Sequence, residues 1–211
     1  MKRWTDGILP VLMFLAAAAA ADDPDGWHGG HEEHGVVVES RHRDSKYEEH
    51  MGAVTLCGTL TDVLLFVSDP DQLADWVPQT LSAERLRDKP DGVVYHVVTD
   101  APWPYRNRDM VYDLTVSLHG TTATVTMKGL PEEAPPPGNL FRMRDVDGEW
   151  WFESRDGQVD VRLRLWVDPG GGPAFIVNRR AAATVGGMLA NLRDRFVCDN
   201  GSPRAQASGG D

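Results

Sequence analysis

The stretch Asp100–Leu118 restricts the possible folds more than any other part of this chain. Pro102 and Pro104 fix their own φ angles and disfavour helix in the residues before them, so the stretch begins as an extended loop. The residues that follow alternate between an apolar and a more polar side, and the apolar side consists of Met110, Tyr112, Leu114, Val116 and Leu118. This period of two predicts a long strand whose apolar face a second layer must cover. Taken alone, it also fits an ordinary half-buried strand of another β-rich domain.

Other segments carry the same strand signals, because they alternate or are rich in β-branched residues and are bounded by Gly, Pro, Asp or Ser. Asp147-Gly148 resembles a two-residue hairpin turn between two of them. We expect about nine strands, at 35–41, 46–58, 80–89, 92–99, 108–118, 121–129, 140–146, 149–154 and 159–167.

Two segments change to a helical period. Thr59–Trp76 predicts two short helices separated at Pro70, and Pro173–Val197 predicts one long helix with a single broad apolar stripe. The arginines at 179, 180, 193 and 195 are expected to face solvent, and Gly186-Gly187 interrupts the long helix. An α+β fold follows, in which the helices cover the apolar faces of the strands.

Four features occur in a characteristic order. Trp27 is followed by the strand 35–41, Asp69 and Trp76 precede Pro78, the block PWP-x3-RD-x-VY spans 102–112, and Asp168-Pro169-Gly170-Gly171 leads into a P-x3-V-N helix start. Together they resemble START (StAR-related lipid transfer) domains over nearly all of 27–196. The resemblance implies a helix-grip fold, in which a curved antiparallel sheet surrounds a long C-terminal helix and encloses one lipid.

The apolar faces of the predicted strands and helix nominate an interior that is rich in methionine and aromatic residues. By themselves these residues describe either a dry core or an apolar cavity, and the resemblance is what favours a cavity. The candidate ligand-binding residues are Tyr112, Leu114, Met127, Phe141, Met143, Trp150, Phe152, Leu163, Leu165, Val185, Met188 and Leu189.

Arg108 and Asp109 match the Arg-Asp pair of the START block, and we interpret them as structural residues that orient the strand through a partly buried ion pair. Some sterol-carrying members of the family have an arginine further along this strand. Leu114 stands at the nearby inward position here, which argues against a sterol-type polar anchor.

We expect a non-catalytic carrier without a cofactor, because only Tyr95, Tyr112 and His96 are titratable candidates for the interior and no Ser-His-Asp set or pair of inward carboxylates is present. The alternatives are a helix-grip enzyme of the cyclase or hydrolase type and a periplasmic accessory protein with a filled core. The candidate gates for a ligand are the proline-rich segment Leu130–Gly138 and the Gly186-Gly187 interruption.

Lys2 and Arg3 precede the apolar run Ile8–Ala21, which is shorter than the roughly 20 residues that a membrane span needs. We therefore interpret residues 1–21 as a cleaved signal peptide and expect a periplasmic or secreted protein. Residues 22–198 would form one START-like lipid-binding domain, and the Gly/Ser/Pro-rich residues 199–211 a disordered tail.

The formal net charge of −11 on 211 residues argues against binding of nucleic acid, for which a basic surface is needed. It also argues against adsorption to anionic lipid surfaces by charge. The expected partners are a lipid or another hydrophobic small molecule and, transiently, a membrane. We expect a monomer.

Cys57 and Cys198 are the only two cysteines, and the spacing leaves open whether they are separate thiols or form a disulfide that closes a long loop. His28, His31 and His34 recur every three residues and would offer zinc or copper ligands on one helical face. The glycines between them weaken a helix, so a solvated N-terminal segment is the favoured interpretation.

Overall fold

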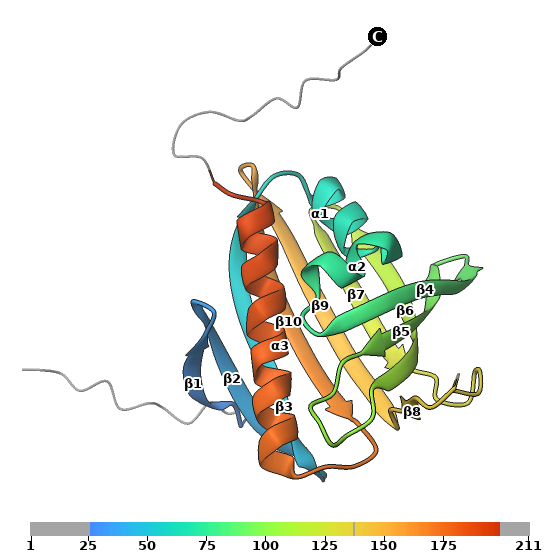
Figure 1. Ribbon diagram of the computed structural model, residues 1–211. Helices are drawn as coiled ribbons and strands as arrows, with labels where there is room; N and C mark the ends of the chain where they lie inside the picture. The colour runs from blue at the N-terminus through green and yellow to red at the C-terminus, as the bar shows by residue number, and fades with distance from the viewer. Residues whose placement is uncertain (1–25, 137, 199–211) are drawn as a thin grey trace, which may run out of the picture.

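A computed structural model describes residues 26–136 and 138–198 of the chain. Figure 1 shows the long helix α3 (Ala174–Arg195) lying in front of one large sheet, with two short helices beside it. The predicted signal peptide 1–21 and the predicted tail 199–211 lie outside the described residues. None of the described helices combines the length and the hydropathy of a membrane span.

The sheet contains ten strands in the described part of the chain, and neighbouring strands are antiparallel except where β8 joins β6. Their order is β1-β2-β3-β10-β9-β7-β6-β5-β4. The α+β prediction of a large antiparallel sheet with a long C-terminal helix is confirmed. The strands are β1 (His28–Glu33), β2 (Val36–Arg43), β3 (Ser45–Cys57), β4 (Thr80–Lys89), β5 (Gly92–Thr99), β6 (Arg108–His119), β7 (Thr122–Gly129), β8 (Phe141–Arg142), β9 (Asp145–Arg155) and β10 (Gln158–Asp168).

The predicted hairpin turn at Asp147-Gly148 is wrong, because β9 runs straight through both residues. Gly148 pairs with Met127 on one side and Leu165 on the other. A Cβ atom at this glycine would lie 3.2 Å from the sulfur of Met127 and 3.3 Å from Cδ1 of Leu165. Gly148 therefore makes room for two neighbouring side chains. The segment expected as the first hairpin strand contributes only the two-residue β8.

The N-terminal segment is also more regular than expected, since residues 28–33 form the edge strand β1, whose pairing with β2 contains one irregularity. Five of its six residues remain exposed. The indole of Trp27, just before β1, is buried beneath the guanidinium of Arg41, whose Cζ lies 4.5 Å from the ring centroid.

The helices begin where side chains can accept hydrogen bonds from free backbone N–H groups. Thr59 caps α1 (Leu60–Val67) by accepting from the N–H of Asp62 at 3.1 Å. Asp69 caps α2 (Pro70–Trp76) by accepting from the N–H of Asp71 at 3.0 Å. Pro70 therefore begins the second helix, at a position where a missing N–H costs nothing.

Three glycines let the C-terminal half of α3 lie close to its surroundings. A Cβ atom on Gly52 of β3 would lie 2.8 Å from Leu189, one on Gly186 would lie 2.8 Å from the carbonyl oxygen of Glu33, and one on Gly187 would lie 2.6 Å from Pro78. The glycine pair therefore marks close packing of the helix against β1 and the segment after α2.

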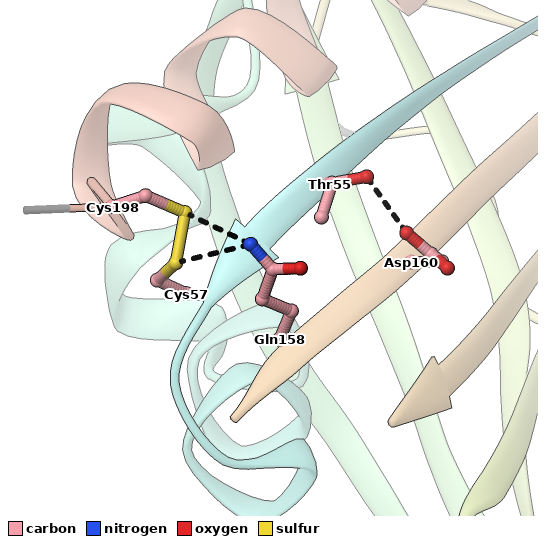
Figure 2. Close-up of a disulfide and its surroundings, with 5 residues drawn as sticks. All are labelled: Thr55, Cys57, Gln158, Asp160 and Cys198. Carbon is pink, nitrogen blue, oxygen red and sulfur yellow. Dashed lines mark hydrogen bonds between the residues drawn. A yellow bond between two sulfur atoms is a disulfide. The ribbon is translucent and has the colours of Figure 1, made fainter. Parts of the chain in front are cut away.

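A disulfide joins Cys57, the last residue of β3, to Cys198 just beyond α3, with a sequence separation of 141 (Figure 2). The N–H of Cys57 also donates to the carbonyl of Phe196 at 3.0 Å, and the side-chain amide of Gln158 lies 3.9 Å from each sulfur. These contacts fix the C-terminal end of α3 to the ends of β3 and β10.

Candidate functional site

An apolar cavity of about 170 Å³ lies between the N-terminal half of α3, the segment 76–80 at the end of α2, and the concave side of strands β5, β6, β7, β9 and β10. Its floor is buried: Trp150 is 1 % exposed, and Tyr112 and Leu114 are each 4 % exposed. The helix contributes Ile176, Arg180, Thr184 and Met188, which recur every four residues and therefore share one face.

Seven of the twelve predicted binding residues lie on the cavity wall, and five do not. Those on the wall are Tyr112, Leu114, Met127, Met143, Trp150, Leu165 and Met188. Those elsewhere are Phe141, Phe152, Leu163, Val185 and Leu189. The alternation of the strands and the stripe of the helix separate inside from outside, but they do not separate the cavity wall from the dry core.

The five residues lie elsewhere for a packing reason. Val185 and Leu189 face Gly52, where the helix approaches β3 so closely that no space remains, and Leu163 pairs with Gly52 from the neighbouring strand. Phe152 stacks on Trp150 at 6.0 Å between ring centroids and is fully packed. Phe141 belongs to β8, where its ring lies under the guanidiniums of two arginines.

The cavity opens between the loop 100–107 and the segment 169–173 before α3, because the exposed residues of its wall, Asp100, Pro102, Tyr105 and Pro173, all belong to these two segments. Arg108 and Arg180 also line this mouth and are half-buried. We call the region formed by 100–108, 169–173 and Arg180 the cavity mouth.

Two polar side-chain atoms of residues in the wall have no hydrogen-bond partner in the part of the chain that the structure describes. Trp76 Nε1 and Thr80 Oγ1 are buried without a hydrogen bond. Burial, and to a smaller degree the neighbouring Tyr95, raises the pKa of the Tyr112 hydroxyl, so this group stays protonated at neutral pH. The hydroxyl of Tyr95, by contrast, donates to the carbonyl of Ser68 at 2.6 Å.

The arrangement is shared with solved structures. A STAR-related lipid transfer protein from Xanthomonas axonopodis matches with a TM-score of 0.74 and 27 % identity, and the match covers 82 % of this chain and 99 % of that chain. Human StAR-related lipid transfer protein 5 and the lipid transfer and protein localization domain of human StarD13 both match with a TM-score of 0.69, at 17 % and 15 % identity; each match covers 82 % of this chain and 89 % of the human one. This chain has the helix-grip fold of START (StAR-related lipid transfer) domains. No protein-family model and no curated protein matches the sequence.

The START block contains the Arg108-Asp109 pair, but the expectation that the two form an ion pair is wrong. Asp109 is fully buried on the other face of β6, and its Oδ2 accepts from Arg142 Nη2 at 2.7 Å and lies 3.0 Å from His96 Nε2. Arg108 donates instead to backbone carbonyls, including that of Pro169 at 3.1 Å. Successive strand residues point to opposite faces, so adjacent partners separate.

The two expected gates of the START cavity are not at its mouth. No described residue of 130–138 lines the cavity, and Arg142 Nη1 holds this segment by donating to the carbonyls of Pro131 at 2.7 Å and Ala134 at 2.6 Å. Gly186 and Gly187 lie against Glu33 and Pro78, away from the opening. The segments that border the opening are those of the cavity mouth.

The three histidines that recur every three residues, His28, His31 and His34, do not gather in one place, and the disfavoured metal-binding alternative finds no support in their arrangement. Among the described residues, the group whose potential ligand atoms all lie within 4.8 Å of one another is His28, His42 and Glu48. His31 instead lies 3.5 Å from Glu33, and His34 follows the end of β1 with a φ of 54°. The three-residue spacing that would align histidines on a helix separates them on a strand.

Sequence reasoning missed the polar residues of the cavity mouth. Arg180 was expected to face solvent, yet it shares the cavity face of α3 with Ile176, Thr184 and Met188. The spacing of four residues was the signal that could have identified it. Tyr105 and the segment after β10 are brought to the site only by the tertiary fold.

Proposed function

We propose that this START-domain protein is a non-catalytic carrier that holds one hydrophobic molecule, a lipid or sterol-like compound, in the cavity between α3 and the sheet. The observation that carries the proposal is the buried apolar floor of a cavity that opens to solvent at one mouth. The shared fold with the Xanthomonas lipid transfer protein supports it.

The size of the cavity favours a slender ligand. Its volume of about 170 Å³ is close to the roughly 150 Å³ that accommodates a benzene-sized molecule and lies below the roughly 300 Å³ at which typical ligand pockets begin. A ring or part of a single acyl chain fits the cavity as it stands. A lipid with two chains would require the helix and the mouth to move apart.

The chemistry of the wall favours binding over catalysis. In the described part of the chain no histidine, cysteine, glutamate or lysine lines the cavity, and its titratable groups are Asp100, Tyr105, Arg108, Tyr112 and Arg180. Four of these belong to the mouth. The remaining one, Tyr112, has no second titratable wall residue on the floor to act with it as an acid–base pair.

Ligand binding can be tested with two substitutions on one strand. Leu114→Asp places a carboxylate on the buried wall, whereas Leu118→Asp places it at a position that is 60 % exposed. We expect Leu114→Asp to abolish binding of a neutral pyrene-labelled hexadecanol and Leu118→Asp to leave it unchanged. Leu114→Trp fills the cavity without introducing a charge and should also abolish binding. It therefore controls for the case in which the buried carboxylate of Leu114→Asp unfolds the protein.

The test has a clear negative result. If the folded wild-type protein binds neither pyrene-labelled hexadecanol nor a fluorescent sterol, and native mass spectrometry of the purified protein finds no bound lipid, the carrier function is excluded. Circular dichroism spectra of all three variants establish that a loss of binding is not a loss of folding.

We further propose that the mouth touches membranes transiently during loading. Trp103 in the loop 100–107 is 93 % exposed and Phe175 in the first turn of α3 is 75 % exposed, so two aromatic side chains are exposed within or next to the segments that border the opening. A tryptophan combines a large apolar ring with a polar N–H group and therefore favours the membrane interface. Trp103→Ser should slow lipid exchange between uncharged vesicles without lowering the equilibrium affinity; an unchanged rate would exclude this role.

Export is the third part of the proposal. The basic residues and apolar run within 1–21 support it, and so does the Cys57–Cys198 disulfide, because disulfides persist in oxidising compartments. N-terminal sequencing of the mature protein should find Asp22 as the first residue. A protein that still began at Met1 would contradict it.

A further inference from the structure

The two arginines that line the cavity at its mouth, Arg108 and Arg180, lack an acidic partner. Arg108 donates through Nε to the carbonyl of Pro169 at 3.1 Å, through Nη1 to that of Arg106 at 3.0 Å and through Nη2 to that of Gly171 at 3.4 Å, which leaves two of its five N–H groups. Arg180 donates through Nη2 to the carbonyl of Asp100 at 3.0 Å. Within the described residues neither guanidinium has a carboxylate oxygen within 4.0 Å. Asp100 is exposed at the same mouth, but its carboxylate pairs with neither arginine.

These arginines retain donors for a ligand. A guanidinium carries five N–H groups, and only one of those on Arg180 is used by the protein. Burial lowers the pKa of Arg108, and the positive charges of Arg180 and Arg106 act in the same direction, yet an arginine remains charged at any physiological pH. The mouth is therefore a cationic rim on a protein of formal net charge −11.

The cavity beneath this rim is apolar and narrow. A molecule that fills it would place an apolar tail against Leu114, Met127 and Trp150 and leave its polar end beside Arg108 and Arg180. Two guanidiniums at one site favour an oxyanion such as a carboxylate or a phosphate, because their N–H groups match the geometry of its oxygen atoms.

We propose that the ligand is a single-chain amphiphile with an anionic headgroup, a carboxylate or a phosphate, whose tail occupies the cavity and whose headgroup is bound by Arg108 and Arg180. This inference rests on the proposed carrier function and specifies its ligand class. It also explains why two cations lie unpaired at the opening of an apolar cavity.

The test compares ligands that differ only in their headgroup. Tryptophan fluorescence follows titration at pH 8 with hexadecanoic acid, hexadecyl phosphate and hexadecan-1-ol. Trp76 and Trp150, two of the seven tryptophans of the chain, lie on the wall and should respond to a bound ligand. We expect at least one of the two anions to bind about tenfold more tightly than the alcohol, because charge-assisted hydrogen bonds are roughly twice as strong as neutral ones. The stronger anion identifies the headgroup as carboxylate or phosphate.

Matched variants locate the effect. Arg180→Gln should reduce the preference for the anion over the alcohol to less than about threefold, and Arg180→Lys should restore part of this preference. Arg179→Gln is the control, because Arg179 is exposed and does not line the cavity. It should retain the full preference.

The outcomes separate the two proposals. If the wild-type protein binds the alcohol and both anions equally, or if Arg180→Gln and Arg179→Gln behave alike, the anionic headgroup site is overturned while the carrier function stands. If the folded protein binds none of the three ligands, the carrier function fails, and the headgroup site fails with it.

Discussion

The Cys57–Cys198 disulfide should contribute several kcal/mol to the stability of this protein because it closes a long loop. It connects residues 141 positions apart and encloses most of the domain, including all of β4–β10 and α3. In the loop-closure model, a cross-link lowers the entropy of the unfolded chain by an amount that grows with the logarithm of the loop length. For this loop the model predicts about 5 kcal/mol at 25 °C.

The perturbation is the double variant Cys57→Ser/Cys198→Ser, which removes the bond but retains the hydrogen bond from the N–H of residue 57 to the carbonyl of Phe196. Urea unfolding followed by circular dichroism gives the free energy of unfolding in water. We expect a loss of about 3–5 kcal/mol for the variant and for the reduced wild type, and no further effect of reductant on the variant.

Two results would refute this reasoning. If the oxidised and reduced wild-type proteins had the same free energy of unfolding, the bond would not constrain the unfolded chain as the model requires. If thiol labelling of the denatured, unreduced protein found two reactive thiols per chain, the bond would be absent.

Three further predictions concern buried groups. Burial lowers the pKa of His50 to about 4, so between pH 6.5 and 4 the unfolded state binds a proton that the folded state does not. The contribution of the neutral His50 to the free energy of unfolding should be fully present above pH 6.5 and should fall by about 3 kcal/mol as the pH decreases towards 4. Urea titrations at several pH values should show this dependence in the wild type but not in His50→Gln. Asp109→Asn should cost about 3–5 kcal/mol, because it leaves the buried guanidinium of Arg142 without its counter-charge; a change in melting temperature no larger than that of a surface substitution would contradict this. Gly186→Ala should destabilise the protein by about 1–3 kcal/mol despite the better helix propensity of alanine, because the added Cβ atom would meet Glu33. If thermal unfolding showed the variant to be more stable than the wild type, α3 would not be packed against Glu33 as described.

The sequence predicted most elements because their signals are local. The alternation from Met110 onward predicted β6, Thr59 lies at a helix start as expected, and Pro70 separates the two short helices as expected, although it also begins the second one. The two prolines in the loop before β6 and the apolar stripe of the last helix belong to the same class of signal. Periods of 2 and 3.6 are properties of single segments, so they can be recognised without a partner.

The candidate site could be predicted only in part. Tyr112, Leu114 and Met127 follow from alternation alone, because each lies on the apolar face of its strand. Arg180 and Tyr105 do not, because the same residue types face solvent at most positions of a protein. Which cations border a cavity depends on which loops the fold brings beside the helix.

What the sequence determined by itself was most of the strands and helices, their apolar faces and the ordered motifs that resemble START domains. The tertiary structure decided everything that depends on a partner distant in the chain. Asp147-Gly148 has the composition of a turn, but two flanking strands pair with it and hold it extended. Gly52 brings α3 against β3 and leaves the space above Trp150 open, so the same apolar faces form a dry core on one side and a cavity on the other. The physical reason is that side chains pack, and strands form hydrogen bonds, between segments that are distant in the sequence. The pattern within one segment does not specify which other segments it will contact.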